Sequence, residues 1–170
     1  MDVDEAIRTR RTNKVYLPEP LTADELAELF ELARWAPNHH LTNPWRFRVV
    51  GPQALAGLKQ ATGDEKAAAK LDRAPTLVAI SVVQTGDAQQ DEEDVCATAC
   101  AVYAVMLGAH ARGMASYWRT PEVLRTAEGR AVLGMAEDEH PLGLLHLGRS
   151  DRAWQPPERA PVGEILRFLA

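Results

Sequence analysis

The first candidate for chemistry is a basic segment near the start of the chain. Arg8, Arg10, Arg11 and Thr12 lie within five residues and follow a short amphipathic stretch. Each planar guanidinium can bind two oxygens at once, so this set is suited to a phosphate group. Taken alone, the segment more often indicates a solvated basic loop.

A second candidate is the run Trp35–Trp45, which leaves a predicted helix at Pro37 and enters a predicted strand. Amide side chains both donate and accept hydrogen bonds, which suits the edge of a heteroaromatic ring. A metal site is a weaker interpretation, because adjacent histidines usually diverge and no carboxylate or cysteine is close in sequence. A third interpretation of the run is a structural turn without function. The polar residues of this run are Asn38, His39, His40, Thr42 and Asn43.

Trp118, Arg119 and Thr120 form a third candidate, at the end of a predicted strand. An arginine beside a tryptophan can bind an anion or stack on a ring. It can also form an interface pair, and the three residues alone do not decide between these roles.

The remaining cysteines and histidines are interpreted as structural. Cys96 and Cys100 are four residues apart in a helical pattern, which is a poor match to CxxC spacing, so we expect two small core residues. His146 alternates with its leucine neighbours and should face the opposite side of its strand from them. We interpret three histidines as ordinary residues with satisfied hydrogen bonds, namely His110, His140 and His146.

Composition narrows the class of protein. The chain has 170 residues, 46% of them hydrophobic and 25% charged, which suits one folded domain and excludes disordered or disulfide-scaffold classes. A net charge of -5 disfavours nucleic-acid binding, although fifteen of the nineteen basic residues are Arg, which leaves room for local anion sites. Only three Ser occur, none in G-x-S-x-G, and GxGxxG, P-loop and zinc motifs are missing. No secretory start is visible, so we expect a cytoplasmic protein without nucleic-acid or membrane partners.

The elements that must position these residues alternate between helix and strand. A capping box at Thr22–Glu25 opens a helix that ends before Pro37, and a long alanine-rich helix is predicted over about residues 89–112. After Gly148 the chain is rich in proline, contains Trp154 and continues with apolar residues. This pattern predicts an extended arm that lies on the body of the domain or on a partner subunit. Strands are predicted at residues 45–50, 76–83, 114–119 and 142–147, with helices at 53–60, 65–71 and 122–134.

In this order, the segments resemble those of the nitroreductase family of flavin enzymes, particularly its short bacterial NAD(P)H nitroreductases. The matches span essentially the whole chain. They are Arg-Arg-Thr, Ala-Pro-Asn-His, Asn-Pro-Trp, Arg-Ala-Pro, Trp-Arg-Thr and Leu-Gly, at residues 10–12, 36–39, 43–45, 73–75, 118–120 and 147–148.

The resemblance implies an α+β fold, with a mixed, mainly antiparallel sheet flanked by helices. It implies a homodimer with a long central helix, one domain over residues 1–170, and a C-terminal arm from about residue 150. FMN would lie at the dimer interface, with residue 39 and its neighbours approaching from the other subunit. The implied cofactor-binding residues are Arg10, Arg11, Thr12, Trp35, Asn38, His39, Asn43, Trp118, Arg119 and Thr120.

The implied activity is ping-pong hydride transfer from NAD(P)H, through FMN, to nitro compounds or related small electron acceptors. The flavin carries this chemistry, so no side chain is assigned a catalytic role and no metal is expected. Trp35 stands where the subgroup often has Arg, and the shorter Asn43 stands where the family usually has Gln. Reduction of enals, quinones or aldehydes on the same scaffold, or a non-catalytic flavin-binding dimer, remain alternatives.

Overall fold

The computed structural model describes residues 1–152, 155 and 157–169; Ala153, Trp154, Pro156 and Ala170 lie outside the described residues. The helices are α1 (Val3–Thr9), α2 (Ala23–Ala33), α3 (Pro52–Ala61), α4 (Glu65–Ala69), α5 (Ala88–Ala111) and α6 (Ala127–Val132). The strands are β1 (Trp45–Val49), β2 (Thr76–Val83), β3 (Ala115–Arg119) and β4 (Glu139–Gly148). Short 3-10 helices are η1 (His39–Leu41), η2 (Lys70–Arg73), η3 (Glu122–Arg125) and η4 (Val162–Glu164).

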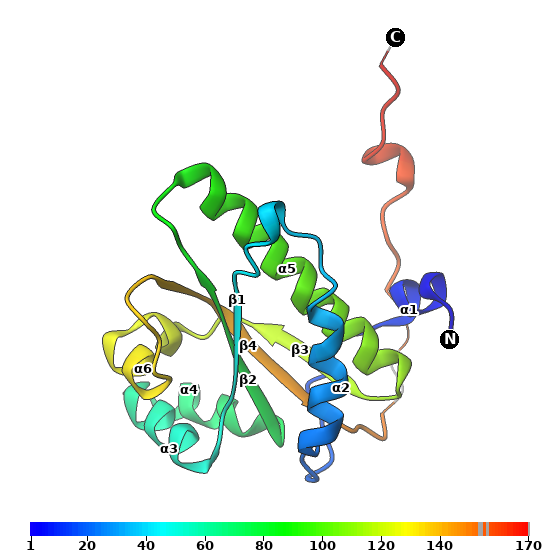
Figure 1. Ribbon diagram of the computed structural model, residues 1–170. Coiled ribbons are helices and arrows are strands. Elements are labelled where there is room, and N and C mark those ends of the chain that lie inside the picture. Colours follow the sequence, from blue (N-terminus) through cyan, green and yellow to red (C-terminus); the bar gives the residue numbers. More distant parts are fainter. Residues whose placement is uncertain (153–154, 156, 170) are drawn as a thin grey trace.

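The four strands form one sheet in the order β1-β2-β4-β3, and every pair of neighbours is antiparallel. β3 is therefore an edge strand. Helices cover both faces of the sheet, with α2 and α5 on one side and α3, α4 and α6 on the other (Figure 1). The predicted α+β, mainly antiparallel fold is confirmed.

Alternation along the two central strands divides the core in two. Val78, Ile80 and Leu145 pack with α2 and α5, whereas Leu77 and Leu144 pack with the smaller helices. Both central strands are thus apolar on both faces, as strands covered on both sides of a sheet require. The capping box predicted at the start of α2 is also present, because the Thr22 hydroxyl accepts from the Glu25 amide and the Glu25 carboxylate accepts from the Thr22 amide.

The helix α5 lies along the sheet (Figure 1). Within the described chain it is the one helix long and apolar enough to cross a membrane, with a mean hydropathy of 1.4 over its best window. Half of that window is buried inside the domain. The core helix of a soluble protein has the same length and composition, so this is weak evidence for a membrane span.

The prediction for the two cysteines is wrong, because Cys96 and Cys100 are both exposed on α5. The helix turns Ala97, Ala101 and Val105 toward the core instead. Alanine and cysteine are similar in size and polarity, so the pattern of small residues did not identify which face packs inward.

Candidate functional site

The segment that contains the predicted phosphate ligands runs along the edge strand β3. Thr12 forms an isolated parallel bridge with Ser116, and the Asn13 amide donates to the Ser116 carbonyl oxygen at 3.1 Å. The α1 helix ends at Arg10, whose amide still donates to the Ala6 carbonyl. Residues 10–13 therefore leave α1 in extended conformation and add a short stretch of backbone to the sheet.

Arg10 and Arg11 have buried guanidinium nitrogens without hydrogen-bond partners in the described chain. The atoms are Nε and Nη1 of Arg10, and Nε and Nη2 of Arg11. The Arg10 guanidinium lies 5.9 Å from the ring centre of Tyr103, and Arg11 Nη1 donates to the Arg10 carbonyl at 3.1 Å. Buried charged donors without partners are costly, so this pair is arranged for an anion that the protein itself does not supply.

A third cation lies close to this pair. Burial, and then the positive charges of Arg159 and Arg10, lower the pKa of the Arg11 guanidinium from its ordinary value. Like charges brought together in this way favour binding of a multiply charged anion such as a phosphate. Arg159 lies in the C-terminal arm and was not among the predicted residues, because nothing in the sequence near it indicates a site.

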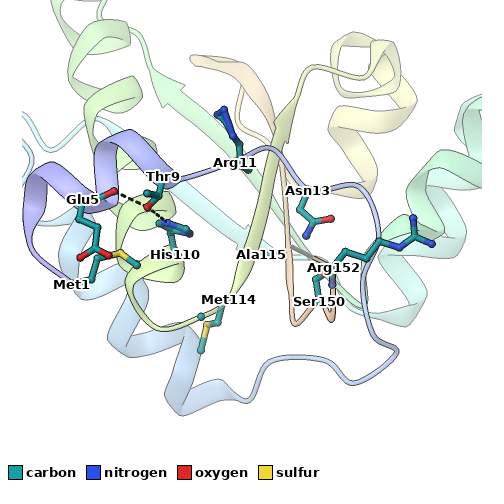
Figure 2. Close-up of a pocket in the computed structure, with 11 residues that line it drawn as sticks. Met1, Glu5, Thr9, Arg11, Asn13, His110, Met114, Ala115, Ser150 and Arg152 are labelled. Carbon is teal, nitrogen blue, oxygen red and sulfur yellow. Dashed lines mark hydrogen bonds between the residues drawn. The ribbon is translucent and has the colours of Figure 1, made fainter. Parts of the chain in front are cut away.

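Arg11 also lines a cavity of about 440 Å³ (Figure 2). The other polar residues that line it are Glu5, Thr9, Asn13, His110, Ser150 and Arg152. The Thr9 hydroxyl donates to the Glu5 carbonyl at 2.6 Å and lies 2.8 Å from His110 Nε2. A hydroxyl has one proton, so the histidine nitrogen is the donor in the second bond. Burial, and then the charge of Arg10, lower the pKa of His110.

Trp118 and Arg119 point to opposite faces of the sheet. The indole of Trp118 packs in the core beneath α5, and its N–H donates to the Leu142 carbonyl at 3.3 Å. Gly143, at φ +150, makes room for it, because a Cβ there would come within 2.4 Å of the indole nitrogen. Arg119 Nη1 donates to the Lys70 carbonyl at 3.5 Å, and Thr120 is exposed just beyond the strand.

Arg119 belongs to a second group of basic and aromatic side chains along β3. Burial lowers the pKa of Arg119, and the charge of Arg73 lowers it further. Lys14 Nζ lies 5.4 Å from the ring centre of Tyr117, whose ring lies 5.5 Å from that of His146. Carboxylates pair with none of these three cations in the described residues.

The prediction that His146 is an ordinary satisfied histidine is wrong. The residue is fully buried, and neither ring nitrogen makes a hydrogen bond of good geometry in the described chain, although the backbones of Lys70 and Leu144 lie near the ring. Burial lowers the pKa of His146 to about 4, so the ring is uncharged at neutral pH. The predicted alternation is confirmed, because Leu145 and Leu147 pack toward α5 while His146 faces Tyr117.

The predicted residues 38, 39 and 43 lie together in a loop of unusual backbone. His40, Leu41 and Asn43 all have positive φ, between 46° and 54°. The Asn38 side chain accepts from the Asn43 amide at 2.9 Å, and His39 Nδ1 lies 2.6 Å from a Glu93 carboxylate oxygen. The loop is therefore fastened to the first turns of α5.

Trp35 lies apart from this loop on an apolar surface. Its side chain is 79% exposed and lines a cavity of about 450 Å³ with Leu32, Cys100 and Leu107. Exposed apolar surface of this extent is characteristic of an interaction site.

A sequence model of the Nitroreductase family matches residues 7–149 of this chain. The chain belongs to the nitroreductase family. The matched range includes all ten predicted site positions, from Arg10 to Thr120. The predicted family and the nitroreductase type of oxidoreductase are confirmed.

Relatives and solved structures agree with that assignment. The Bacillus subtilis (strain 168) protein named "Putative NAD(P)H nitroreductase YfhC" is 23% identical, over 92% of this chain and 88% of the relative. The crystal structure of a nitroreductase-like family protein from Bacillus cereus superposes with a TM-score of 0.90 at 22% identity, covering 99% of this chain and 96% of that one. The FMN and NADPH-dependent nitroreductase NfnB from sphigopyxis sp. strain HMH gives a TM-score of 0.81 at 20% identity, with both chains fully covered.

The nitroreductase fold thus brings Arg10, Arg11 and Thr12 alongside β3, and it places residues 38–43 against another part of α5. Arg10 lies over Tyr103 while His39 contacts Glu93, and these two helix positions are about 15 Å apart along the axis. In the described residues, groups of three or more His, Cys, Asp or Glu able to hold a metal ion are not found.

Proposed function

We propose that this nitroreductase is an FMN-dependent oxidoreductase that uses NAD(P)H to reduce nitro compounds or related small electron acceptors by ping-pong hydride transfer. The observation that carries the proposal is the set of buried, unpartnered guanidinium nitrogens of Arg10 and Arg11. The FMN phosphate offers the oxygens that such groups require. The names of the relatives, which include NAD(P)H nitroreductases and an FMN and NADPH-dependent enzyme, support the same cofactor pair.

The β3 edge is the proposed seat of the flavin. Arg10 and Arg11 bind the phosphate, with Arg159 adding charge, and Thr12 contacts the body of the cofactor. The backbone at the end of β3, from Trp118 to Thr120, lines the ring. The Trp118 side chain has a structural role, because its indole is already packed and hydrogen-bonded.

When bound, FMN would supply the redox chemistry for hydride transfer from NAD(P)H to the acceptor. The protein binds and orients the ring and sets the charge around it. Lys14 follows Thr12 by two residues and lies over Tyr117 without a carboxylate partner in the described chain. We assign Lys14 the positive charge beside the ring that favours acceptance of electrons. No side chain is needed as a nucleophile.

The working unit in this proposal is a homodimer of one-domain chains spanning residues 1–170. Two features support it. The outer face of α5 exposes Cys96, Cys100 and Tyr103, and the arm after about residue 150 exposes Ile165, Leu166, Phe168 and Leu169 as it extends from the body (Figure 1). Pairing through α5 would bring Trp35, Asn38, His39 and Asn43 of one chain to the flavin held by Arg10 of the other.

The acceptor and its alternatives follow from the same site. The cavities near the proposed flavin are open and partly apolar, which suits flat aromatic acceptors with little selection. Enals, quinones and aldehydes are therefore included in the acceptor class to be tested. We also propose a cytoplasmic location, since NAD(P)H is a co-substrate.

The test is anaerobic stopped-flow spectroscopy of the purified protein after addition of FMN. We expect a flavin spectrum that NADH or NADPH bleaches and that a nitro compound or quinone restores. A protein that takes up no FMN contradicts the proposal at its base. Flavin that is bound but not bleached by either nicotinamide would instead support the non-catalytic flavin-binding dimer.

A further inference from the structure

Acidic residues at the start of α5 contact the loop that contains His39. Asp91, Glu92, Glu93 and Asp94 read most simply as a solvated run at the positive end of a helix dipole. The structure gives them separate contacts. Asp91 accepts from the amides of Thr85 and Gly86, whereas Asp94, which is buried, accepts from the Thr42 hydroxyl at 2.6 Å.

The loop needs such external fastening. Three residues with side chains at positive φ within residues 40–43 adopt a conformation that L-residues rarely choose, and surrounding contacts must hold it. Thr42 is held by Asp94, and the two ends of the loop are joined by Asn38 and the Asn43 amide. Figure 1 shows the loop between α2 and β1 lying along α5.

Glu93 contacts His39, the histidine of this loop that lines a groove. Its Oε2 lies 2.6 Å from His39 Nδ1, and Gln89 donates to its other oxygen at 3.2 Å. The hydrogen bond from His39, followed by that from Gln89, lowers the pKa of Glu93, so the carboxylate is ionised and can only accept. The proton of this bond is therefore on Nδ1. His40 stacks on His39, with ring centres 3.9 Å apart and planes within 14°, and fixes the plane of the imidazole.

The other ring nitrogen is left for a ligand. His39 lines a groove of about 600 Å³ with Asn38, Cys96 and Cys100, and Nε2 has no hydrogen-bond partner among the residues described. From this geometry we infer that Glu93 is a positioning residue for the flavin site: it holds His39 by Nδ1, so that Nε2 faces the flavin bound by a second copy of the chain. The inference rests on the proposed function for the presence of that flavin.

The ion pair itself should add little to folding stability. The side chains of His39 and Glu93 are 56% and 35% exposed, and exposed pairs contribute little. Removing the carboxylate should therefore change the orientation of His39 without unfolding the domain. This separates a positioning role from a structural one.

The first test is the ¹⁵N spectrum of the histidines in the apoprotein, with the His39 signals assigned by their loss in His39→Gln. We expect the proton of the neutral ring on Nδ1 in the wild type and in Glu93→Gln, whose amide oxygen can still accept. In Glu93→Ala the proton should move largely to Nε2. Wild-type protein with the proton on Nε2, or a Glu93→Ala spectrum like that of the wild type, would overturn the inference without any flavin being present.

The second test is FMN affinity by quenching of flavin fluorescence. Glu93→Ala should weaken FMN binding about 10-fold with an unchanged melting temperature, and Glu93→Gln should restore most of it. The matched control is Glu19→Ala, which removes an exposed carboxylate that lies outside the His39 groove and should bind FMN like the wild type. Equal affinity of Glu93→Ala and the wild type refutes the positioning role, whereas wild-type protein that binds no FMN refutes the proposed function instead.

Discussion

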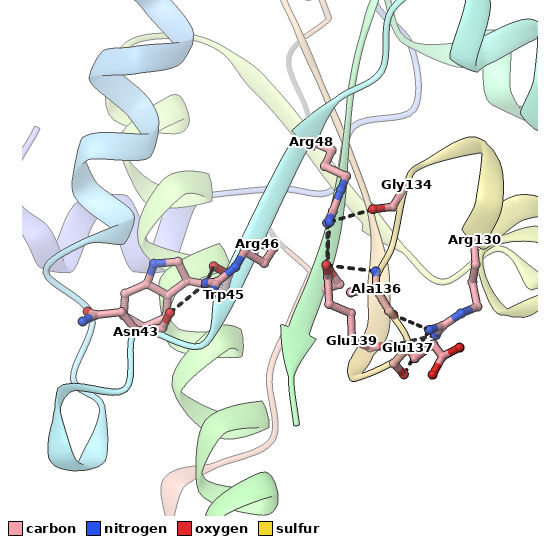
Figure 3. Close-up of polar contacts among 10 residues, drawn as sticks. Asn43, Trp45, Arg46, Arg48, Arg130, Gly134, Ala136, Glu137 and Glu139 are labelled. Carbon is pink, nitrogen blue, oxygen red and sulfur yellow. Dashed lines mark hydrogen bonds and ion pairs between the residues drawn. The ribbon is translucent and has the colours of Figure 1, made fainter. Parts of the chain in front are cut away.

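Arg48 and Arg130 differ from Arg10 and Arg11 in what their guanidinium groups contact. Arg48 donates to both carboxylate oxygens of Glu139, at 2.6 and 2.8 Å, and to the Ser81 hydroxyl at 3.0 Å (Figure 3). Arg130 donates to the carbonyl oxygens of Glu139 and Ala136, each at 2.7 Å.

Arg10 and Arg11 have no such partners. Each has two buried guanidinium nitrogens without a hydrogen bond in the described chain, and the neighbouring charge is positive. The first pair of arginines thus joins β1 and α6 to β2, β4 and the turn before β4, which stabilises the fold. The second pair lowers the stability of the fold, and a bound anion would offset that loss. A ligand-binding site differs in this way from a group of residues that only stabilises the fold.

The largest effect should follow from the double substitution Arg10→Ala with Arg11→Ala. Two charged hydrogen-bonding groups would be lost, and at about 2 kcal/mol each the Kd for FMN should rise about 1,000-fold. The free energy of unfolding of the apoprotein should change little. The Arg11 hydrogen bond to the Arg10 carbonyl and the Arg10 contact with Tyr103 would be lost, but so would four buried guanidinium nitrogens without hydrogen bonds. Flavin fluorescence titration and chemical denaturation measure the two quantities. Flavin retained by this variant would contradict the assignment of Arg10 and Arg11 as the phosphate site.

The converse variant is Arg48→Ala, which breaks a pair whose carboxylate is buried. We expect the free energy of unfolding to fall by about 3 kcal/mol while FMN affinity stays at the wild-type value. Arg46→Ala is the matched control, since Arg46 is exposed and donates only to the carbonyls of Asn43 and Trp45. A loss of FMN affinity in Arg48→Ala at unchanged stability would show that the two arginine sets are not separate in function.

A smaller effect concerns pH. The hydrogen bond from Arg48, more than that from Ser81, lowers the pKa of Glu139 from 4.5 to about 2. Its contribution is therefore complete above pH 4.5 and is lost as the pH falls toward 2. Wild-type protein should exceed Glu139→Gln by about 2 kcal/mol in free energy of unfolding at pH 7, and the difference should shrink below pH 4.5. A difference that is constant from pH 7 to pH 2.5 would contradict the assigned pairing.

Local patterns predicted most of the fold. The capping box at Thr22 and Glu25 and the strand Thr76–Val83 were found as expected, because both depend on neighbours within a few residues. The alanine-rich helix was located correctly but not its inward face, so Cys96 and Cys100 were misplaced in the core.

The site was only partly predictable, for a physical reason. Arg10 and Arg11 were recognised by type and spacing, but whether a carboxylate would neutralise them depends on residues distant in sequence. Glu93 illustrates this, since its partner His39 is 54 positions away and the acidic run around it reads as solvated. His146 was misjudged likewise, because its missing partners are a property of the packed sheet and not of its strand.

The central claim is that one flavin is bound by Arg10 and Arg11 of one chain and His39 of another. Mixed dimers of an Arg10→Ala, Arg11→Ala chain with a His39→Ala chain test it, with FMN titrated by fluorescence. One site of such a dimer would carry both defects and the other would have every residue intact. We predict one site of wild-type affinity per mixed dimer, although neither parental homodimer has any. Mixed dimers that lack a site of wild-type affinity would contradict a site shared between two chains.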